Sequence, residues 1–215
     1  MDFVLSTIAM LQIHMMRYNQ NKTTELLERA VREERERVTS VSMVTILAIN
    51  NAVQAKDLYT GQHSQRVSLF SCLIAEKLGW DKNSIDELKS IALLHDIGKI
   101  GVDEKILNKP SKLTDEEYGQ MKNHTVMGGE ILKDLTLIPN VDLGAKHHHE
   151  RFDGRGYPEG LSGEDIPIEA RIICIADTFD AMTSKRVYRN SLDIDFVKEE
   201  IRKNKGTQFD PQIAD

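Results

Sequence analysis

The feature that most restricts how this chain can fold is a long segment without glycine or proline, from Thr24 to Lys56. Glutamate, arginine, leucine, valine and alanine dominate it, a composition that favours helix. Thr24 is a suitable first residue, because its hydroxyl can accept a hydrogen bond from the first turn. The pattern predicts one long helix, whose first half carries too many charges to be buried on all sides.

One side of this predicted helix carries apolar residues at alternating four- and three-residue steps, as coiled coils do. This seam consists of Leu27, Val31, Val38, Val41, Ala48, Ala52 and Ala55. Glu34 and Thr45 interrupt the seam, and the run from Arg32 to Arg37 beside it is highly charged. We therefore predict a coiled-coil stalk that forms a homodimer and carries a signal from an upstream module. The alternative is a solvated helix that leans on the rest of the domain.

The start of the chain contains a shorter apolar run, from Phe3 to Met16, which polar side chains interrupt. It falls short of the ~20 residues that a membrane-spanning helix needs, and it lacks the features of a signal peptide. We expect a helix packed on protein; the alternative is the remnant of a membrane helix that anchors the full-length protein. We divide the chain into residues 1–44, a helical linker or stalk, and residues 45–215, one functional domain.

After Gly61 the chain shows a series of amphipathic helical patterns joined by short loops. Thr114 and Glu117 form a capping box for the helix that reaches His124. A loop rich in glycine and proline is expected over 151–167, and segment 168–182 is assigned to helix because it lacks a strand partner. The expected helices span 64–78, 83–94, 114–124, 126–135, 141–149, 168–182 and 193–203. The predicted fold class is all-α, a helical bundle with a long N-terminal helix.

The composition is that of a globular protein, with 40% hydrophobic and 29% charged residues. A net charge of −6 gives no overall attraction to a nucleic-acid polymer or an anionic membrane, so local cations or metals must hold any phosphate-bearing substrate. Cys72 and Cys174 lie in apolar surroundings without a second cysteine nearby, and we expect two reduced thiols in a cytoplasmic protein. The sequence has no paired-cysteine zinc motif.

The strongest local motif joins two potential metal ligands to a nearby cation, directly after an apolar helix face. Burying an imidazole and a carboxylate together is costly, and a divalent metal removes that cost. The carboxylate of Asp96 can bridge two metals, which an imidazole cannot do. Lys99 follows three residues later on the same helical face, where it can reach a phosphate. The motif reads Leu94-His95-Asp96-Ile97-Gly98-Lys99.

The distribution of the other histidines supports a metal site, because six of the seven lie between residues 63 and 149. Three of them are consecutive and stand beside a glycine-rich loop, which structural hydrogen bonding alone explains poorly. We interpret His147 as a neighbour of the site rather than a ligand. The histidines expected to bind metal are His63, His95, His124, His148 and His149.

Two motifs together resemble the HD-GYP subgroup of the HD phosphohydrolase superfamily, over residues 45–215. The first is His95-Asp96-Ile-Gly-Lys99, and the second is His148-His149-Glu150-Arg-Phe-Asp153-Gly154-Arg-Gly156-Tyr157-Pro158. The resemblance implies an all-helical fold and two divalent metals, with iron the first expectation, manganese the second and other metals open. It also implies hydrolysis of cyclic di-GMP to linear pGpG, with further hydrolysis to GMP in some members.

The resemblance also implies how the ligands are divided between the two metals. The first set consists of His63, His95, Asp96 and Asp177, and the second of His124, His148 and His149, with Asp96 as the bridge. Some members bind a third metal through a glutamate four residues before the first histidine. Tyr59 stands at that position here, so two metals are expected.

Further residues match positions that the family uses for catalysis and substrate binding. Lys99 would stabilise charge on the phosphate during attack by an activated water, so Asp96 and Lys99 are the expected catalytic residues. Arg186 and Arg189 would hold phosphates or guanine edges, unless they form a solvated basic turn. The other expected substrate contacts are Tyr157 and Asp180. Candidates for hydrogen-bond acceptors of the ligand histidines are Glu150, Asp153 and Asp180.

Three alternatives stand beside the cyclic di-GMP phosphodiesterase. A cyclic GMP-AMP hydrolase would use the same metal site, whereas the intact Gly156-Tyr157-Pro158 loop argues against a general HD nucleotide phosphohydrolase. A non-catalytic module that binds a dinucleotide or a protein would typically have lost metal ligands, and none is lost here. The same loop is also a candidate contact for a signalling-protein partner. Gln62 and Thr125 replace a common glycine and a common proline of the family.

Overall fold

The computed structural model describes residues 2–56, 62–184 and 191–215. Over these residues it is all-helical, and the two isolated β-bridges are the only strand-like pairings. The all-α prediction is therefore confirmed. The chain divides into two compact units, Met1–Thr45 and Ile46–Asp215. Tyr59, Gly61, Arg186 and Arg189, on which several predictions rest, lie outside the described residues.

Helix α1 runs without interruption from Asp2 to Lys56 and is longer than the predicted segment. The apolar run over 3–16 is part of this helix rather than a separate element, and its described apolar side chains are exposed in the single chain. These are Met10, Leu11, Ile13, Met15 and Met16. Among the described residues, no helix is both long and apolar enough to cross a membrane. The seam residues Leu27, Val31, Val38 and Val41 are also exposed.

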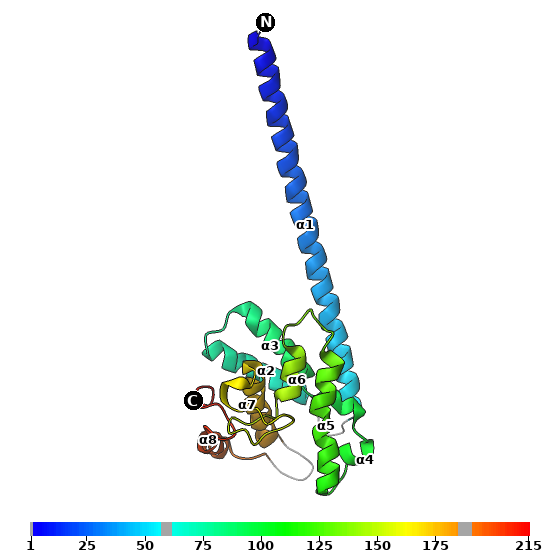
Figure 1. Ribbon diagram of the computed structural model, residues 1–215, viewed down its shortest axis with the longest axis vertical. Helices are drawn as coiled ribbons and strands as arrows, with labels where there is room; N and C mark the ends of the chain where they lie inside the picture. Colours follow the sequence, from blue (N-terminus) through cyan, green and yellow to red (C-terminus); the bar gives the residue numbers. More distant parts are fainter. Residues whose placement is uncertain (1, 57–61, 185–190) are drawn as a thin grey trace. The chain divides into compact units, whose positions relative to one another are not determined.

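The second unit contains the remaining helices, which are drawn in cyan to red in Figure 1. In chain order they are α2 (His63–Lys77), α3 (Lys82–Leu94), the 3-10 helix η1 (Ile97–Gly101), α4 (Glu104–Leu107), α5 (Asp115–Leu132), α6 (Val141–His147), the 3-10 helix η2 (Gly163–Asp165), α7 (Ile168–Thr183) and α8 (Ile194–Lys203). Helix α2 packs on α3 and α7, and α5 packs on α6 and η1.

The core of this unit lies where α3, α6 and α7 meet. Leu88, Ile91, Ile172 and Ile173 are almost completely buried there, and burial of each such side chain contributes roughly 1.5–3 kcal/mol. Gly144 of α6 allows the close approach of α3, because a Cβ at this position would lie 2.2 Å from Ile91. The core thus holds together α7, which carries Asp177, and the two helices whose C-terminal ends lead into His95 and His148.

One helix prediction was wrong in its boundaries. We expected a helix to end at His124 and another to cover 126–135, whereas α5 continues from Asp115 through both segments to Leu132. Gly128 and Gly129 do not break it; both lie against α6, and a Cβ added at Gly129 would lie 3.2 Å from the Lys146 side chain. The capping box of Thr114 and Glu117 is present as predicted.

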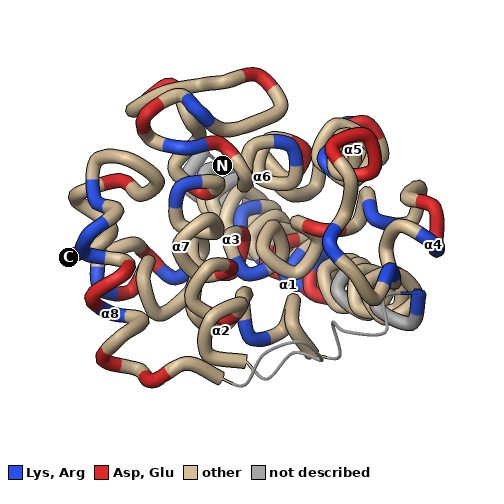
Figure 2. Tube along the Cα trace, turned by 90° about the horizontal axis from the view of Figure 1, so that it is seen from below, with Lys and Arg blue, Asp and Glu red and all other residues tan. Residues whose placement is uncertain are grey.

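The charged residues of the second unit are interspersed rather than separated by sign. Figure 2 shows acidic and basic positions alternating along its helices and loops. Several of these positions form neighbouring ion pairs, for example Lys109 with Glu117 and Lys146 with Glu159. Attraction of an anionic ligand must therefore come from a local arrangement of groups, as the net charge of −6 had indicated.

Candidate metal centre

The side chains of all seven predicted metal ligands come together at one place in the second unit. They come from different elements: α2 begins at His63, α3 ends before His95, α5 carries His124, and α7 carries Asp177. His148 and His149 follow the last residue of α6. The potential ligand atoms form three groups, and within each group they lie within 4.8 Å of one another. The groups are His63–His95–Asp177, His124–His148–His149 and His95–Asp96–His148.

The carboxylate of Asp96 lies between two of these groups. Its Oδ2 atom is 3.3 Å from His95 Nε2 and 3.8 Å from His63 Nε2. Its Oδ1 atom is 3.4 Å from His124 Nε2 and 3.9 Å from His148 Nε2. Each carboxylate oxygen thus faces a different set of histidines, which is the arrangement expected of a ligand that bridges two cations.

Each set is completed by one residue that borders a cavity. Asp177 Oδ1 lies 3.2 Å from His63 Nε2 and completes the first set, and His149 completes the second. Asp177 and His149 are partly accessible, whereas the other five ligands are buried. A ligand entering from the cavity would therefore meet the centre on the side of these two residues.

Backbone carbonyls orient three of the histidines. In each case the ring Nδ1 lies within hydrogen-bond distance of the carbonyl oxygen three residues earlier in the chain. Because a carbonyl can only accept, Nδ1 carries the proton, and the Nε2 lone pair is directed at the centre. The pairs are His95 with Ala92 at 2.7 Å, His124 with Met121 at 2.6 Å and His148 with Ala145 at 2.8 Å.

His63 is oriented by a carboxylate instead. Its Nδ1 lies 2.7 Å from Oδ2 of Asp180, and Arg66 donates to Oδ1 of the same carboxylate at 2.5 Å. Asp180 is only 1% exposed, so the prediction that it contacts substrate does not fit its position. Its predicted role as an acceptor for a ligand histidine fits this geometry.

Glu150 and Asp153, the other two expected acceptors, act elsewhere in the structure. Glu150 is buried and accepts hydrogen bonds from the backbone of Glu159 at 2.8 Å and Gly160 at 3.0 Å, so it holds the glycine-rich loop in place. Asp153 pairs with Arg151 at 3.2 Å. Both are candidates as acceptors for the ligand histidines, but backbone carbonyls fill that role for His95, His124 and His148.

The loop places Tyr157 directly against the centre. Its ring lies 4.9 Å from the ring of His149, between centroids, at an angle of 33°. Gly156 has to be glycine here, because a Cβ would lie 2.3 Å from the backbone nitrogen of Arg151. Burial raises the pKa of the Tyr157 hydroxyl far above its usual value, so the side chain is a neutral donor. Tyr157 therefore supports a ligand histidine and also lines the adjacent cavity.

This cavity has a volume of about 560 Å³ and opens beside His149 and Asp177. Sequence reasoning missed several of its lining residues, among them Tyr118, Arg151, Thr178 and Gln208. Tyr118 lies 6.5 Å from Tyr157 between ring centroids. Nothing in the local sequence indicates these contacts, because the residues come together only when α5, α7 and the chain near the C-terminus assemble.

Burial sets the charge state of the second histidine set. Because burial penalises the charged form, it lowers the pKa of His149 to about 4 and that of His148 well below its usual value. The pKa of His124 is lowered for the same reason. These imidazoles are neutral near pH 7, which is the form that binds a metal.

The first set has the opposite electrostatics. Burial alone would lower the pKa of His63, but hydrogen bonds to Asp177 and Asp180 outweigh it and raise the pKa to about 9. Burial would raise the pKa of Asp96, but the charge of Lys99 and contacts with His95 hold it well below its usual value. Lys99 Nζ lies 2.7 Å from Asp96 Oδ2, so a cation already stands at the carboxylate.

The donors fit a pair of divalent metals. The Nε2 atom of His95 is buried and has no hydrogen-bond partner among the described residues, which is costly for a polar atom unless something else binds it. Imidazole nitrogens and carboxylate oxygens together suit iron, manganese or zinc. The ionised carboxylates of Asp96 and Asp177 supply the negative charge that such cations require.

The family model of the HD domain matches residues 48–213. The chain belongs to the HD domain family. The match covers the second unit almost completely and includes all seven predicted ligands. Membership of this family is what the resemblance carried by the His95-Asp96 motif implied.

Several curated relatives of this HD domain are phosphodiesterases by name. A "Cyclic di-GMP phosphodiesterase" of Thermotoga maritima is 41% identical over 170 residues, covering 78% of this chain and 46% of the relative. The "Cyclic di-GMP phosphodiesterase response regulator RpfG" of Xanthomonas campestris is 39% identical, covering 85% and 47%. A "3'3'-cGAMP-specific phosphodiesterase 2" of Vibrio cholerae is 40% identical, covering 83% and 34%. The chain thus spans less than half the length of these relatives.

Two solved structures share the fold of this HD domain. A cyclic GMP-AMP specific phosphodiesterase of V. cholerae superposes with a TM-score of 0.58 at 21% identity, covering 78% of this chain and 46% of the other. Bd1817, described as an HDG"Y"P protein from Bdellovibrio bacteriovorus, gives a TM-score of 0.57 at 22% identity, covering 71% and 49%. At these identities the likeness concerns the fold alone.

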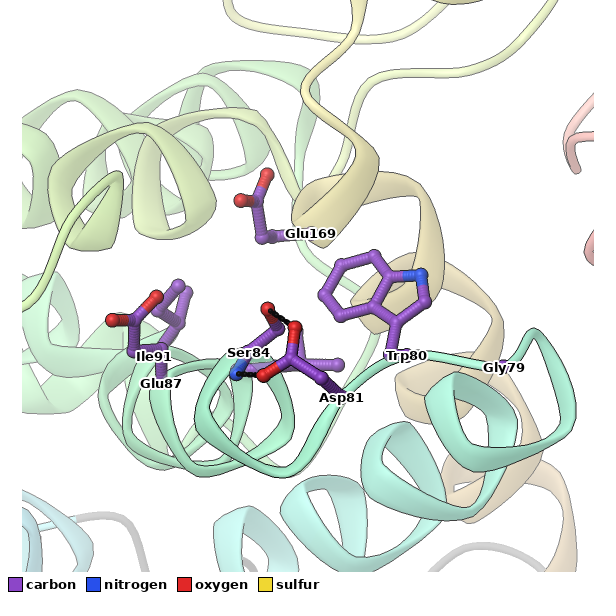
Figure 3. Close-up of a pocket in the computed structure, with 8 residues that line it drawn as sticks. Gly79, Trp80, Asp81, Ser84, Glu87, Ile91 and Glu169 are labelled. Carbon is purple, nitrogen blue, oxygen red and sulfur yellow. Dashed lines mark hydrogen bonds between the residues drawn. The ribbon is translucent and has the colours of Figure 1, made fainter.

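A second cavity in the HD domain, of about 420 Å³, lies between the start of α3 and the start of α7. Figure 3 shows Glu169 of α7 across from Ser84 and Asp81, with the Trp80 ring beside Asp81. Asp81 is already engaged, because it accepts hydrogen bonds from the backbone of Asn83 and Ser84 and so caps α3. None of the predicted site residues lines this cavity.

Gln62 and Thr125 replace residues that are common at these positions of the resembled family, and Gln62 has an unusual backbone conformation. Gln62, directly before His63, has a φ of 64°, in the left-handed region that glycine adopts without strain. This conformation explains why glycine suits the position. Thr125 stands where proline is common. It is buried within α5, where its hydroxyl donates to the carbonyl of Lys122 at 2.9 Å.

Proposed function

We propose that this HD domain is a two-metal phosphodiesterase that hydrolyses cyclic di-GMP to linear pGpG, with GMP as a further product if hydrolysis continues. The observation that carries the proposal is the position of Asp96, whose two oxygens face two separate sets of ligand atoms. The names of the relatives support the substrate class. Since the chain spans only part of those relatives, the substrate is inferred from the part of their length that this chain matches.

The proposed cofactors are two divalent metals, with iron first and manganese second. The first would be held by His63, His95, Asp96 and Asp177 and the second by His124, His148, His149 and Asp96. When bound, such metals supply Lewis-acid chemistry that activates water and polarises a phosphate. His149 and Asp177 border the cavity, so the substrate phosphate would reach the centre from there.

The protein's own groups position the substrate and balance its charge. Water oxygen forms a bond to phosphorus, the bond from phosphorus to the ribose 3′-oxygen breaks, and that oxygen takes up a proton. Lys99, held 2.7 Å from Asp96, is placed to stabilise the negative charge that grows on the non-bridging oxygens. Tyr157, beside Tyr118, offers an aromatic wall for a nucleobase. Arg186 and Arg189 remain proposed phosphate or guanine contacts.

A second candidate substrate is cyclic GMP-AMP, hydrolysed at the same centre. It is favoured by two V. cholerae relatives named as 3'3'-cGAMP-specific phosphodiesterases, which are 40% and 39% identical to this chain. The two dinucleotides differ in one base only, so discrimination would occur at the cavity wall and not at the metals. A non-catalytic binding module is a third possibility, against which the complete ligand set speaks.

The wider assignment of the chain is also a proposal. We assign residues 1–44 to a stalk and 45–215 to the catalytic domain, which would act in the cytoplasm. The exposed seam of α1 supports a homodimer through a coiled coil. The Gly156-Tyr157-Pro158 loop is a candidate surface for a signalling-protein partner. A nucleic-acid polymer is not an expected partner, given the net charge of −6.

The test is hydrolysis by purified protein loaded with Fe(II) or Mn(II), followed by chromatography of the products from cyclic di-GMP and cyclic GMP-AMP in parallel. The double variant His95→Ala/Asp96→Ala should lose its bound metal and at least about a thousandfold in rate, because several kcal/mol of transition-state stabilisation depend on the metals. His14→Ala, an exposed histidine of α1, is the matched control and should behave as the wild type. Unchanged turnover in the double variant would overturn the mechanism.

A further inference from the structure

The last residue of α1 makes a specific contact with the segment that follows the metal-binding motif. The ammonium group of Lys56 donates hydrogen bonds to the carbonyl oxygens of Ile100 and Val102, both at 2.6 Å. Hydrogen bonds from a charged donor are shorter and roughly twice as strong as those between neutral groups. One side chain thus ties the end of a 55-residue helix to η1 and the residue after it.

This segment is directly connected to the catalytic residues. Asp96 immediately precedes η1, and Lys99 lies within it. The backbone nitrogen of Lys99 donates to the Asp96 carbonyl at 3.0 Å, and that of Val102 donates to the Lys99 carbonyl at 3.1 Å. A short hydrogen-bonded chain therefore leads from the bridging aspartate to a carbonyl that Lys56 holds.

The glycines of η1 lie close to α5. Gly98 packs so closely on α5 that a Cβ there would lie 1.9 Å from the carbonyl oxygen of His124, a residue of the second ligand set. Gly101 packs on Met127 in a similar way. Two neighbours therefore hold η1: α5 by close packing at its glycines, and Lys56 by hydrogen bonds at its C-terminal end.

The end of α1 is itself fixed to the second unit. Ile46, Asn50 and Val53 are buried there, and Asn108 donates to the carbonyl of Lys56 at 3.0 Å. Seven residues after Lys56 the chain reaches His63, a member of the first ligand set. The helix end is therefore linked to the centre through the backbone on one route and through η1 on the other.

We propose that Lys56 is a positioning residue for the metal centre. It holds η1 so that Asp96 presents one oxygen to each ligand set and Lys99 stays beside that carboxylate. A displacement of the end of α1 is transmitted through this contact to Asp96, so Lys56 provides one of the two routes by which the helix affects metal binding. The inference rests on the proposed metal centre but not on the identity of the substrate.

The test compares Lys56→Met, which removes the ammonium but keeps the length of the side chain, with Lys56→Arg, which restores the charge. Titration calorimetry with Mn²⁺ should show about tenfold weaker binding in Lys56→Met and near-normal binding in Lys56→Arg, since loss of a residue that orients ligands typically costs tenfold or more. Hydrogen exchange of the peptide covering residues 97–103 should be faster in Lys56→Met. The rate constant kcat, measured at saturating metal, should fall while KM changes little.

Lys82→Met is the matched control, because Lys82 is exposed at the start of α3 and should leave all of these measurements unchanged. Thermal unfolding shows whether each variant is folded at the temperature of the titration. Wild-type Mn²⁺ affinity and wild-type exchange over 97–103 in folded Lys56→Met would overturn the proposal, as would Lys56→Arg that binds no better than Lys56→Met. These measurements need no substrate, so they stand even if neither dinucleotide is hydrolysed.

Discussion

At the scale of single residues, the geometry of the centre depends on the groups that hydrogen-bond to the ligand histidines and orient their rings. Among the hydrogen bonds of the described residues, the ring of His63 is held by a carboxylate, that of Asp180, which Arg66 holds in turn. The three histidines with known carbonyl partners are oriented by their own helices, so no substitution of a side chain can release them in the same way. His63 is therefore the ligand most open to change through a neighbour.

We predict that Asp180→Asn weakens binding of one Mn²⁺ ion by about tenfold, because the amide no longer holds His63 through a charged acceptor. The second ligand set should keep its affinity, so titration calorimetry should separate the two binding steps. Asp153→Asn is the control, since its carboxylate pairs with Arg151 and meets no ligand histidine. Equal loss in both variants would mean that general destabilisation explains the effect.

The buried histidines also predict how the stability of the metal-free protein depends on pH. The pKa of His149 is about 4 in the folded protein, against 6.5 for an ordinary histidine, so the unfolded chain binds more protons between these values. The free energy of unfolding should therefore fall as the pH decreases from 6.5 towards 4, by about 3 kcal/mol for this group.

His63 acts in the opposite direction, because its pKa is raised to about 9. Its contribution is fully present below pH 6.5 and is lost as the pH rises through 9. Urea unfolding of metal-free protein at pH 5, 7 and 9 should give the highest stability at pH 7. A stability that does not decline between pH 7 and pH 5 would contradict the assignment of neutral, buried imidazoles.

Among the residues, the sequence alone identified a cluster of histidines with an aspartate, and the family resemblance divided them into two sets. The motif could not reveal which groups orient them. The acceptors for His95, His124 and His148 are backbone carbonyls, which every residue possesses, so no residue type marks them. Asp180 was assigned to substrate as well as to a histidine, and only its burial separates the two roles.

At the scale of elements, glycine positions decide how closely helices approach. The break that we predicted at Gly128 and Gly129 was wrong because local propensity treats glycine as a helix breaker, whereas these glycines serve contact with α6. Gly98 has an even closer neighbour in the His124 carbonyl. Packing between helices, which the local sequence does not contain, sets the boundaries here.

We predict that Gly98→Ala destabilises the protein by at least ~2 kcal/mol, because the added Cβ would overlap the backbone of α5. Gly119→Ala, on the exposed side of α5, has nothing within 4 Å of the new Cβ and should stabilise the protein by ~0.5–1 kcal/mol. Denaturant unfolding of the two variants measures both signs. Two variants of equal stability would show that η1 yields to the added methyl group.

At the scale of the whole molecule, helical periodicity was enough to predict an all-α fold. Five of the predicted helices match α2, α3, α6, α7 and α8 within a few residues. The sequence did not predict which helices pack against each other, because an amphipathic pattern shows which face is buried but not which helix covers it. The exposed seam of α1 remains unexplained within one chain, because Leu27, Val31, Val38 and Val41 contact solvent. This exposure leads to the prediction of a homodimer.

Sedimentation velocity should show a dimer for the wild-type chain and a monomer for Val31→Asp/Val38→Asp, because two buried negative charges in a coiled-coil seam are unfavourable. Thr39→Asp/Ser40→Asp adds the same charge outside the seam and should remain dimeric. Both double variants should bind Mn²⁺, since the ligands lie in the second unit. A wild-type chain that sediments as a monomer at micromolar concentration would refute the coiled-coil dimer.

The position of Asp96 between two ligand sets has a consequence for how the centre fills. A single carboxylate that serves both sets makes them one thermodynamic unit, because occupancy of either set alters the field at the shared group. Linkage then requires reciprocity: whatever factor the first ion imposes on the affinity for the second, the second imposes on the first. The response to metal concentration would thus be a property of both sites together. Protein with one metal bound would be a species distinct from the metal-free and fully loaded forms.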